Sequence, residues 1–493
     1  MHDVIPFAAV VLVASVALLL AVGSSRITAL TQIPSPALFL VAASIAVDLV
    51  PDLGGLGIEA DQRIVTVALV VILFEGGMHI GLDRFRPVAG PVLWLGVAGT
   101  FVTAAGLAVV AHLVFGFDWR PALLLGTALA PTDPATVFSV LGRREVTGRS
   151  GTLLEGEAGA NDPVGIALMI AILGATGGGA GAVAHGAGEF VLQMVVGIAF
   201  GVAGGHALRW LLRHLPMPNE TLYPLRTVAF ALVLYGVTTV AHGSGFLAVM
   251  LAGILVGDTR APYKREIEHF ASGLASLAEI VAFTLLGLSI PLSSAFSDGH
   301  GLLALGVAAV LFLLVRPLLV GLVLIPVRLR RGERAFVLWS GLKGVVPILL
   351  GTYVVVEGAP DAQRIYAVVF VVVLLSVVVQ GGLVPTLARL WRVPMRVVEP
   401  EPWAMGMRFR DQPEGLHRYV VESGSPADGA TLRDLPLEED VWISIVSRRG
   451  RMVQVRGGTT LAEGDEVLAL ASDATLVAGL FRASSGRPPH GNP

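Results

Sequence analysis

Hydrophobic segments long enough to cross a membrane recur along most of this chain, and they limit what it can fold into. A transmembrane helix needs about 20 mainly apolar residues. About thirteen such segments are present, centred near residues 13, 38, 72, 103, 130, 163, 200, 232, 250, 280, 314, 346 and 376. Of the 493 residues, 54% are hydrophobic and only 14% are charged, which is typical of a polytopic membrane protein. We therefore expect residues 1–395 to form an all-α membrane domain of about 13 helices.

Basic residues divide unevenly between the two sides that this count defines. With the N-terminus outside, the inner loops hold 19 Arg and Lys residues and the outer loops hold three. The inner residues are Arg26, Arg84, Arg86, Arg143, Arg144, Arg149, Arg209, Arg213, Arg226, Arg260, Lys264, Arg265, Arg328, Arg330, Arg331, Arg334, Arg389, Arg392 and Arg396; the outer ones are Arg63, Arg120 and Arg364. The positive-inside rule then predicts a protein of the cell (inner) membrane with its C-terminal part in the cytoplasm. The first segment lacks a basic flank, so we expect it to be a retained span rather than a cleaved signal peptide.

The chain changes character after about residue 395. Residues 405–485 carry more charge and contain short period-two alternations, which are typical of strands. Two stretches, Ala430–Leu435 and Ala474–Phe481, are predicted as short helices. We expect a small cytosolic α+β regulatory domain here, followed by a disordered tail over residues 486–493. The strands carry no phosphate-binding loop, so whether this domain binds a nucleotide is left open. No nucleic-acid partner is expected.

The sixth apolar segment, residues 151–175, contains four polar side chains close together: Glu155, Glu157, Asn161 and Asp162. A carboxylate at bilayer depth costs at least about 2.5 kcal/mol, so such groups usually face a water-filled cavity or a partner charge. On a helix Glu157 and Asn161 share a face, whereas Asp162 lies about 140° around the axis from Glu157. We expect Asp162 to face an ion cavity and Glu157 to meet a partner inside the protein. Backbone amides at a helix N-terminus are the alternative partners, and they suit Glu155 best.

Two further segments cannot be continuous helices. In the fifth, Thr132 and Asp133 lie between two prolines, and in the twelfth, residues 339–351, Gly344 and Pro347 interrupt the helix. Broken helices at membrane depth expose carbonyl groups that can coordinate cations. Two breaks in corresponding positions of the two halves predict an inverted-repeat transporter with two broken, crossing helices and a site near the bilayer midplane. Two simple proline kinks are the alternative.

Charged residues in other segments are candidates for the same region. Lys343, in the twelfth segment, needs a counter-charge at this depth. Glu157 is its natural partner, with Arg316 of the eleventh segment competing for the same acid. Snorkelling to the inner surface is the alternative for Lys343. Glu75 in the third segment is a candidate cation ligand or supporting acid, whereas Glu279 in the tenth is interpreted as structural.

Five motifs, taken in order, resemble those of NhaP-type monovalent cation/proton antiporters. They are LFEGG (73–77), APTDP (130–134), EAGANDPVG (157–165), HGSGFLA (242–248) and GLKGVVP (341–347). The resemblance runs from the first segment to about residue 390, and the paired Asn161 and Asp162 are its most specific part. The tail is similar to the C-terminal half of the potassium-regulator module (TrkA-C, also called RCK-C), which is often attached to the potassium-handling branch.

The resemblance implies roles for particular residues. Asp162 would be the shared carrier of proton and cation, and Asn161 would support it. Thr132 and Asp133 would lie at the helix crossing, and Glu157 would bridge to the basic residue of the twelfth segment. The resemblance also implies a homodimer, in which a core bundle moves against a dimerisation domain.

Two positions depart from the family pattern. Ala158 stands where many members have Ser, which removes one hydroxyl ligand. Lys343 stands where the twelfth segment usually has Arg, and a lysine cannot make a bidentate contact with a carboxylate. These departures bear on ion selectivity and on the pH profile.

The function predicted from these features is exchange of a monovalent cation for H⁺ by alternating access. Deprotonated Asp162 would bind the metal ion together with oxygens near Thr132, and protonation would expel it. The ion would be K⁺, which the tail favours, or Na⁺. One titrating acid beside the neutral Asn161 predicts electroneutral exchange. No cofactor beyond the transported ions is expected; the expected partners are those ions, membrane lipid and a second copy of the chain.

Two other functions stay open at this point. A cation channel gated by the tail would need a continuous pore, and a proton-coupled carrier of an organic solute would ignore K⁺ and Na⁺. An enzyme is not expected, because the sequence shows no nucleophile–base pair and no ligand spacing for a metal. The chain has no cysteine, which excludes disulfides and thiolate metal sites.

Overall fold

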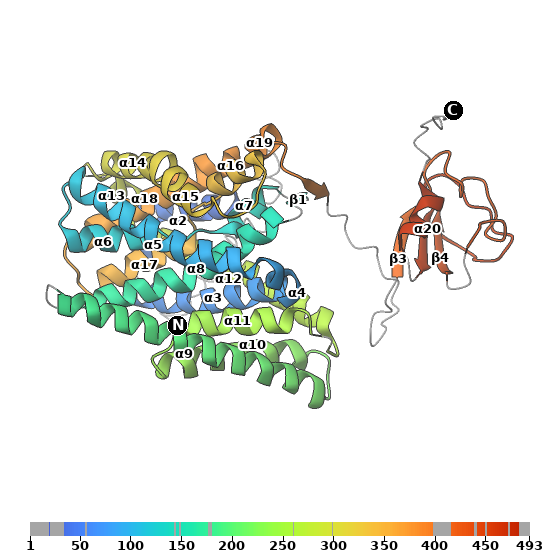
Figure 1. Ribbon diagram of the computed structural model, residues 1–493, viewed down its shortest axis with the longest axis horizontal. Coiled ribbons are helices and arrows are strands. Elements are labelled where there is room, and N and C mark those ends of the chain that lie inside the picture. The colour runs from blue at the N-terminus through green and yellow to red at the C-terminus, as the bar shows by residue number, and fades with distance from the viewer. Residues whose placement is uncertain are drawn as a thin grey trace, which may run out of the picture. The chain divides into compact units, whose positions relative to one another are not determined.

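The structure, a computed structural model, describes Leu19 and residues 34–54, 57–141, 144–146, 149–175, 180–259, 261–297, 299–397, 416–437, 441–448, 451–471 and 474–482. The chain divides into two compact units, residues 1–398 and 399–493. Figure 1 shows the first unit as a bundle of helices and the second as a small sheet with one helix.

Helices make up almost all of the first unit over its described residues. In chain order the α-helices are α2 (Ser35–Leu49), α3 (Ile58–Ile80), α4 (Leu82–Phe85), α5 (Ala89–Leu113), α6 (Trp119–Ala128), α7 (Pro134–Leu141), α8 (Arg149–Gly174), α9 (Ala180–His214), α10 (Leu222–Val240), α11 (Gly245–Gly257), α12 (Lys264–Leu288), α13 (Leu292–Phe296), α14 (His300–Val310), α15 (Gly321–Val323), α16 (Arg331–Trp339), α17 (Val345–Val356), α18 (Ala362–Leu375) and α19 (Gly382–Leu390). Short 3₁₀ turns, η1 (Pro51–Gly54) and η2 (Arg86–Val88), join some of them. Strands β1 (Arg144–Val146) and β2 (Met395–Val397) form an antiparallel pair.

The predicted apolar segments from the second to the thirteenth each coincide with a helix or with a broken pair of helices. Seven helical stretches in the described residues are long and apolar enough to cross a membrane: Ile58–Ile80, Leu82–Leu113, Ala180–His214, Leu222–Val240, Lys264–Leu288, His300–Val323 and Ala362–Leu390. Helices α2, α11 and α17 are shorter apolar helices. The mostly helical fold class is therefore confirmed. The first predicted segment lies outside the described residues apart from Leu19, so the count of 13 stays a prediction.

Two helices change from α-helical to π-helical geometry along their length. Helix α14 continues as the π-helical segment η3 (Leu311–Val320), and α18 continues as the π-helical segment η4 (Ser376–Gly381). Pro317 lies inside η3 and cannot donate a backbone hydrogen bond, which disfavours regular α-helical geometry around it. π-Helical turns often occur where a functional side chain must be redirected. The residue before this proline is Arg316, which enters the candidate site described below.

Helices α3 and α11 pack so closely that their backbones touch. A Cβ atom on Gly77 of α3 would lie 2.5 Å from the Met250 carbonyl oxygen. A Cβ atom on Gly253 of α11 would lie 2.4 Å from the Phe74 carbonyl oxygen. Small residues permit this close approach between helices in membranes, where tight packing stabilises association. Any larger side chain at either position would separate the two helices.

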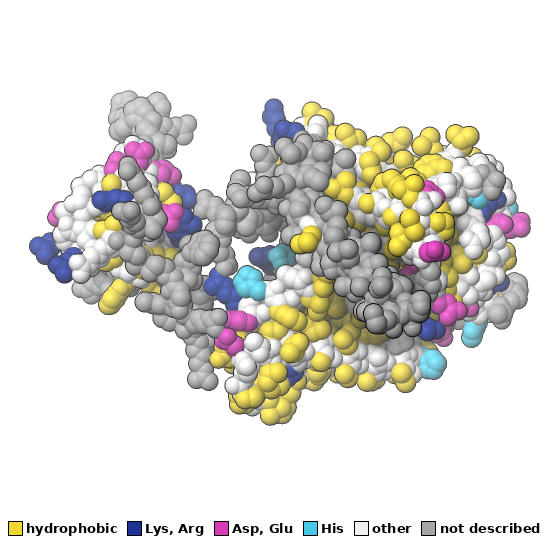
Figure 2. Space-filling model, turned by 180° about the vertical axis from the view of Figure 1, so that it is seen from behind, with side chains coloured by type: hydrophobic (Ala, Val, Ile, Leu, Met, Phe, Trp, Pro, Cys, Tyr) yellow, Lys and Arg dark blue, Asp and Glu magenta, His cyan; other side chains and the backbone are white. Residues whose placement is uncertain are grey.

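The outer surface of the first unit is rich in exposed apolar side chains. Figure 2 shows them over much of the face that is in view. Leu113, Val240 and Leu302 are among the most exposed of the large hydrophobic residues. Water-soluble monomers rarely expose apolar surface on this scale. The surface therefore suits contact with lipid.

The second unit is a four-stranded antiparallel sheet with one helix. The strands are β3 (Leu416–Val420), β4 (Trp442–Arg448), β5 (Arg451–Val453) and β6 (Glu466–Leu470), in the order β3-β6-β4-β5. The predicted helix Ala474–Phe481 is present as α20. The predicted helix Ala430–Leu435 is wrong. There, the Leu432 and Arg433 amides donate to the carbonyls of Thr459 and Gly457, so two of its amides pair with a distant loop and the segment forms a turn, not a helix.

Candidate functional site

The fifth and twelfth segments are both broken, and their breaks meet. Helix α6 ends at Ala128 and α7 begins at Pro134; α16 ends at Trp339 and α17 begins at Val345. The Asp133 amide donates a 2.8 Å hydrogen bond to the Leu342 carbonyl, which joins the two extended stretches. A Cβ atom on Gly344 would lie 2.0 Å from the Asp133 carboxylate, so glycine is required for this approach. The structure thus brings together the two interruptions that the sequence predicts.

Lys343 lies in the second of these breaks and is fully buried. Its ammonium group donates to the carbonyl oxygens of Ala130 and Pro131, both at 3.0 Å. These carbonyls follow the end of α6, where a helix leaves acceptors without partners and a partial negative charge. Lys343 therefore stabilises the broken helix, and the predicted ion pair between Lys343 and Glu157 is wrong.

Arg316, the competing cation, is the partner of Glu157. Their side chains lie 3.0 Å apart, with only 3% and 4% of the Arg316 and Glu157 side chains exposed. The Arg316 guanidinium also donates to the carbonyls of Leu338, at 2.8 Å, and Val337, at 3.3 Å. The pairing arises because η3 directs Arg316 into the bundle. Lys343 is held elsewhere, by the carbonyls of the break between α6 and α7. Glu157 thus meets a partner inside the protein, as the helical periodicity predicts, but from a different helix.

Asp162 lines a small cavity between the broken helices. The cavity has a volume of about 40 Å³ and is walled by Leu69, Ile72, Thr132, Asp133, Asp162, Glu279, Val345, Val346 and Pro347. Asp162 is buried, and its Oδ1 atom has no hydrogen-bond partner among the described residues. Two further acids, Asp133 and Glu279, line the same cavity. A cavity needs about 10–15 Å³ of probe-occupied volume to hold one water molecule, so this space has room for a small ion and for water.

Asn161 and Thr132 are joined by two hydrogen bonds. The Asn161 side-chain amide donates to Thr132 Oγ1 at 2.7 Å, and the Thr132 amide donates to Asn161 Oδ1 at 3.3 Å. Asn161 therefore fixes the extended stretch of the broken helix beside Asp162 without adding charge. These contacts place Thr132 at the wall of the cavity.

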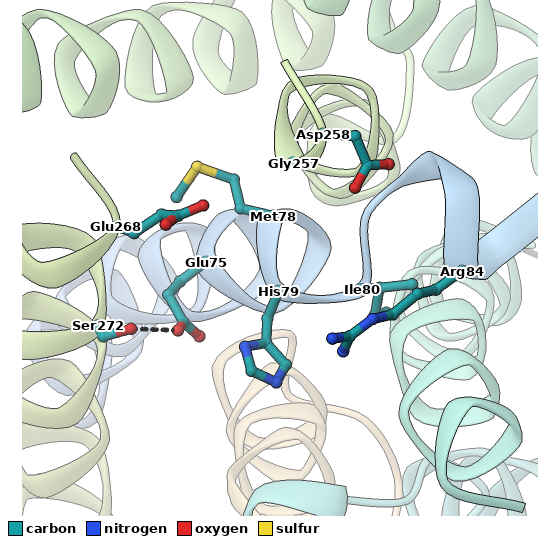
Figure 3. A pocket seen from close by; sticks show the side chains of 9 residues that line it. All are labelled: Glu75, Met78, His79, Ile80, Arg84, Gly257, Asp258, Glu268 and Ser272. Atoms are coloured by element: carbon teal, nitrogen blue, oxygen red, sulfur yellow. Dashed lines mark hydrogen bonds between the residues drawn. The ribbon is translucent and has the colours of Figure 1, made fainter. Parts of the chain in front are cut away.

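Glu75 does not line this cavity. It lies in a separate pocket of about 300 Å³, together with His79, Glu268 and Ser272, and accepts a 2.6 Å hydrogen bond from the Ser272 hydroxyl. Figure 3 shows the Glu75 carboxylate on α3 facing Ser272, with His79 one turn further along the same helix.

Glu279 is a cavity residue whose position the sequence interpretation missed. It lines the same space as Asp162, and its Oε1 atom likewise lacks a hydrogen-bond partner within the described ranges. The signal that could have located it is the polar stripe Ser272, Ser276 and Glu279 on α12. These three residues follow helical spacing on a span whose other side chains are mainly apolar.

Comparison with known proteins gives consistent matches over both units. The family profile "Sodium/hydrogen exchanger, transmembrane" matches residues 11–390, and the "TrkA-C domain" profile matches residues 416–478. The chain is 36% identical to the K⁺/H⁺ antiporter NhaP of Alkalimonas amylolytica over 473 residues, which is 94% of this chain and 82% of that protein. It is 31% identical to the K⁺/H⁺ antiporter NhaP2 of Shewanella sp. (strain MR-4) over 95% of this chain and 81% of that one.

A solved structure has the same fold. The sodium proton antiporter MjNhaP1 from Methanocaldococcus jannaschii superposes with a TM-score of 0.65 at 23% sequence identity, covering 74% of this chain and 97% of that one. At this level of identity the likeness concerns the fold alone.

Proposed function

We propose that this chain, which belongs to the sodium/hydrogen exchanger family, exchanges K⁺ for H⁺ with Asp162 as the shared carrier. Family membership makes the protein a multi-pass membrane transporter and a cation/proton antiporter, not an enzyme. The choice of K⁺ rests on the two relatives named as K⁺/H⁺ antiporters, which match this chain over more than nine tenths of its length. Na⁺ is the alternative ion.

One observation carries the proposed mechanism: Asp162 has an unpartnered oxygen in a cavity that is large enough for a small ion. The deprotonated carboxylate binds the dehydrated cation, with further oxygens from Thr132 and the adjoining extended stretch. Protonation removes the charge and releases the cation. Because the space does not accommodate an organic solute in this conformation, the geometry favours an inorganic ion over the organic-solute carrier.

Charge balance around the cavity supports electroneutral exchange. Glu157 is neutralised by Arg316, and Asn161 is uncharged, so neither needs to change its protonation state during transport. Asp133 and Glu279 share the cavity with Asp162. One H⁺ per cation then requires both of these acids to keep the same protonation state throughout the cycle.

The setting of the transporter is also part of this proposal. We place it in the cell (inner) membrane with its N-terminus outside and the TrkA-C-like domain, residues 405–485, in the cytoplasm, on the strength of the loop charges. A homodimer in lipid follows from the family resemblance. The exposed apolar residues of α9, such as Val183, Val191 and Val195, offer surface for lipid or for a second copy.

Everted membrane vesicles with a fluorescent proton probe test the proposal. Addition of K⁺ should release H⁺ from wild-type vesicles, and Na⁺, Rb⁺ and Li⁺ at matched concentrations across a range of pH rank the selectivity. Vesicles carrying Asp162→Asn should show no cation-driven H⁺ movement although the protein is folded and present in equal amount. Retained flux in Asp162→Asn would contradict the assignment. Current far above carrier turnover would indicate a channel.

A further inference from the structure

Two buried polar side chains of the π-helical segment η4, Ser376 and Gln380, take no part in the mechanism above. Ser376 is fully buried and Gln380 is 2% exposed. The Ser376 hydroxyl donates a 2.8 Å hydrogen bond to the side-chain oxygen of Gln380, four residues later. A buried carboxamide is costly unless its donors and acceptors are paired. The other partners of this pair therefore show what it holds in place.

Gln380 holds the end of α16. Its side-chain amide donates a 2.6 Å hydrogen bond to the Trp339 carbonyl, and the Trp339 indole donates one of 3.1 Å to the Gln380 backbone carbonyl. Trp339 is the last residue of α16, where helix carbonyls have no partner within their own helix. Pro385, five residues after Gln380, has no N–H, so the Gln380 carbonyl cannot accept a π-type hydrogen bond from that position. Gln380 and Trp339 are thus joined by two hydrogen bonds.

Ser376 holds the other side of the same break, close to the start of α17. Its hydroxyl oxygen accepts a 2.9 Å hydrogen bond from the Lys343 backbone amide. Only Gly344 separates Lys343 from the first residue of α17. The hydroxyl therefore uses its donor on Gln380 and its acceptor on Lys343. Together the two side chains of η4 fix the broken stretch, residues 340–344, at both of its sides.

This stretch in turn fixes the break between α6 and α7. The Leu342 carbonyl accepts a 2.8 Å hydrogen bond from the Asp133 amide. The Lys343 ammonium donates to the carbonyls of Ala130 and Pro131, both at 3.0 Å. Lys343 is thus held at its backbone by η4 and at its side chain by the other break. A shift of its backbone would draw the ammonium away from both carbonyls.

The same stretch also leads directly into a wall of the cavity. Val345, Val346 and Pro347, the first three residues of α17, line the cavity that contains Asp162, and Val345 lies two residues after Lys343. Neither Ser376 nor Gln380 is among the residues that wall this cavity. The two η4 side chains can therefore influence a bound ion only through the backbone that they hold.

We propose that Gln380 and Ser376 are positioning residues of the cation site. They fix residues 340–344, and through them both the start of α17 and the oxygens of residues 130–132 beside Asp162. This inference rests on the proposed function and adds η4, which touches no ion, to the parts that shape the same site. Small displacements of positioned groups weaken binding strongly. Loss of either side chain should therefore lower the affinity for the cation, while the Asp162 carboxylate remains to carry it.

Transport kinetics in everted vesicles test the proposal. Gln380→Met removes both side-chain hydrogen bonds at similar side-chain length, and it should raise the KM for K⁺ about fivefold. The maximal rate per folded transporter should stay within about twofold of the wild-type rate. Ser376→Ala removes only the hydroxyl and should raise the KM about threefold.

Two matched controls lie away from the break. Gln193 of α9 is also buried, and its side-chain amide donates to Glu189 at 3.3 Å. Ser44 of α2 is as buried as Ser376, and its hydroxyl donates to the Ile290 carbonyl at 2.7 Å. Gln193→Met and Ser44→Ala should leave the KM for K⁺ unchanged. An unchanged KM in Ser376→Ala, whatever its stability or maximal rate, would overturn the proposal, and this variant decides the question if Gln380→Met does not fold.

A double-mutant cycle tests the route through Lys343. If Gln380 acts by holding the backbone of Lys343, the variant Gln380→Met/Lys343→Met should raise the KM by clearly less than the product of the two single effects. Effects that multiply fully would show that Gln380 and Lys343 act independently, and would overturn the proposed route.

The outcomes separate this inference from the proposed function. Wild-type, Gln193→Met and Ser44→Ala vesicles without cation-driven proton movement would contradict the function itself. Normal exchange in all three, together with wild-type KM values in both η4 variants, would remove only the positioning role.

Discussion

Glu157 and Asp162 lie five residues apart on the same helix, yet their surroundings differ. Glu157 pairs with the Arg316 guanidinium at 3.0 Å through one oxygen, whereas its other oxygen, Oε2, has no hydrogen-bond partner among the described residues. Asp162 lines a cavity large enough for a small ion, and its Oδ1 atom lacks a hydrogen-bond partner there. The neighbours of an acid therefore decide whether it stabilises the fold or remains available to bind a proton and a cation. The comparison predicts opposite effects when each acid is neutralised.

Neutralising Glu157 should give the largest loss of stability. Glu157→Gln leaves the buried Arg316 guanidinium without its counter-charge, and breaking a buried pair costs about 3–5 kcal/mol. Thermal unfolding in detergent should show this loss, whereas Asp162→Asn should unfold at or above the wild-type temperature. The double variant Glu157→Leu/Arg316→Leu should recover most of the stability. A Glu157→Gln protein as stable as Asp162→Asn would break the comparison.

Removing the Lys343 ammonium should have the next largest effect. Lys343→Met keeps the length of the side chain but leaves the carbonyls of Ala130 and Pro131 without a donor, which costs about 2–3 kcal/mol. Because those carbonyls belong to the broken stretch beside Thr132, the KM for K⁺ should also rise. Unfolding and vesicle transport measured on the same preparation check both effects. Lys264→Met, at the other lysine, which pairs with the 49% exposed Glu268 at 3.0 Å, is the control and should change neither.

Asn161 should contribute less, through positioning. Asn161→Ala removes two hydrogen bonds to Thr132, for a loss of about 1–2 kcal/mol. A raised KM with a nearly unchanged maximal rate is expected, because the carrier Asp162 is intact. The control is Thr100→Val, which removes one buried hydroxyl hydrogen bond away from the cavity. A fall in maximal rate at unchanged KM would show that Asn161 acts on translocation instead.

The smallest effect on stability is expected from an ion pair of the second unit in which one side chain is exposed to solvent. Asp465 accepts two hydrogen bonds from Arg448, whose side chain is 43% exposed. The Arg448 guanidinium holds the pKa of Asp465 below its usual value of 3.8. The resulting stabilisation is complete above that usual value and is lost as the pH falls through the lowered pKa. The protection of the β4 and β6 amides against hydrogen exchange, relative to an unfolded chain at the same pH, should therefore fall below about pH 4. Asp465→Asn should remove that acid dependence; the same dependence in the variant would assign it to another carboxylate.

The sequence predicted the features that follow from periodicity and chain interruption. The apolar segments from the second to the thirteenth, the two breaks, and the different directions of Glu157 and Asp162 all depend on local spacing, and the structure has them. The choice between Lys343 and Arg316 as the partner of Glu157 was wrong. The correct partner depends on where two distant helices place their basic side chains. Arg316 reaches Glu157 from the π-helical segment η3, and an apolar sequence pattern does not predict π-helical turns.

One other error and one missed position have a similar origin. The position of Glu279 at the cavity was missed because a lone acid in an apolar segment gives no sign of which neighbours it will meet. Residues 430–435 were predicted as helical because the tertiary pairing of Leu432 and Arg433 with a later loop cannot be read from that stretch alone. The sequence therefore locates polar groups reliably along each helix, and tertiary packing decides their partners.

The contact between α3 and α11 bears on how the protein moves. Where Gly77 and Gly253 bring backbone against backbone, there are no side chains that could change rotamer and let one helix slide along the other. We expect α3 and α11 to move together through the transport cycle, and the Glu75 carboxylate, two residues before Gly77, to change position with them.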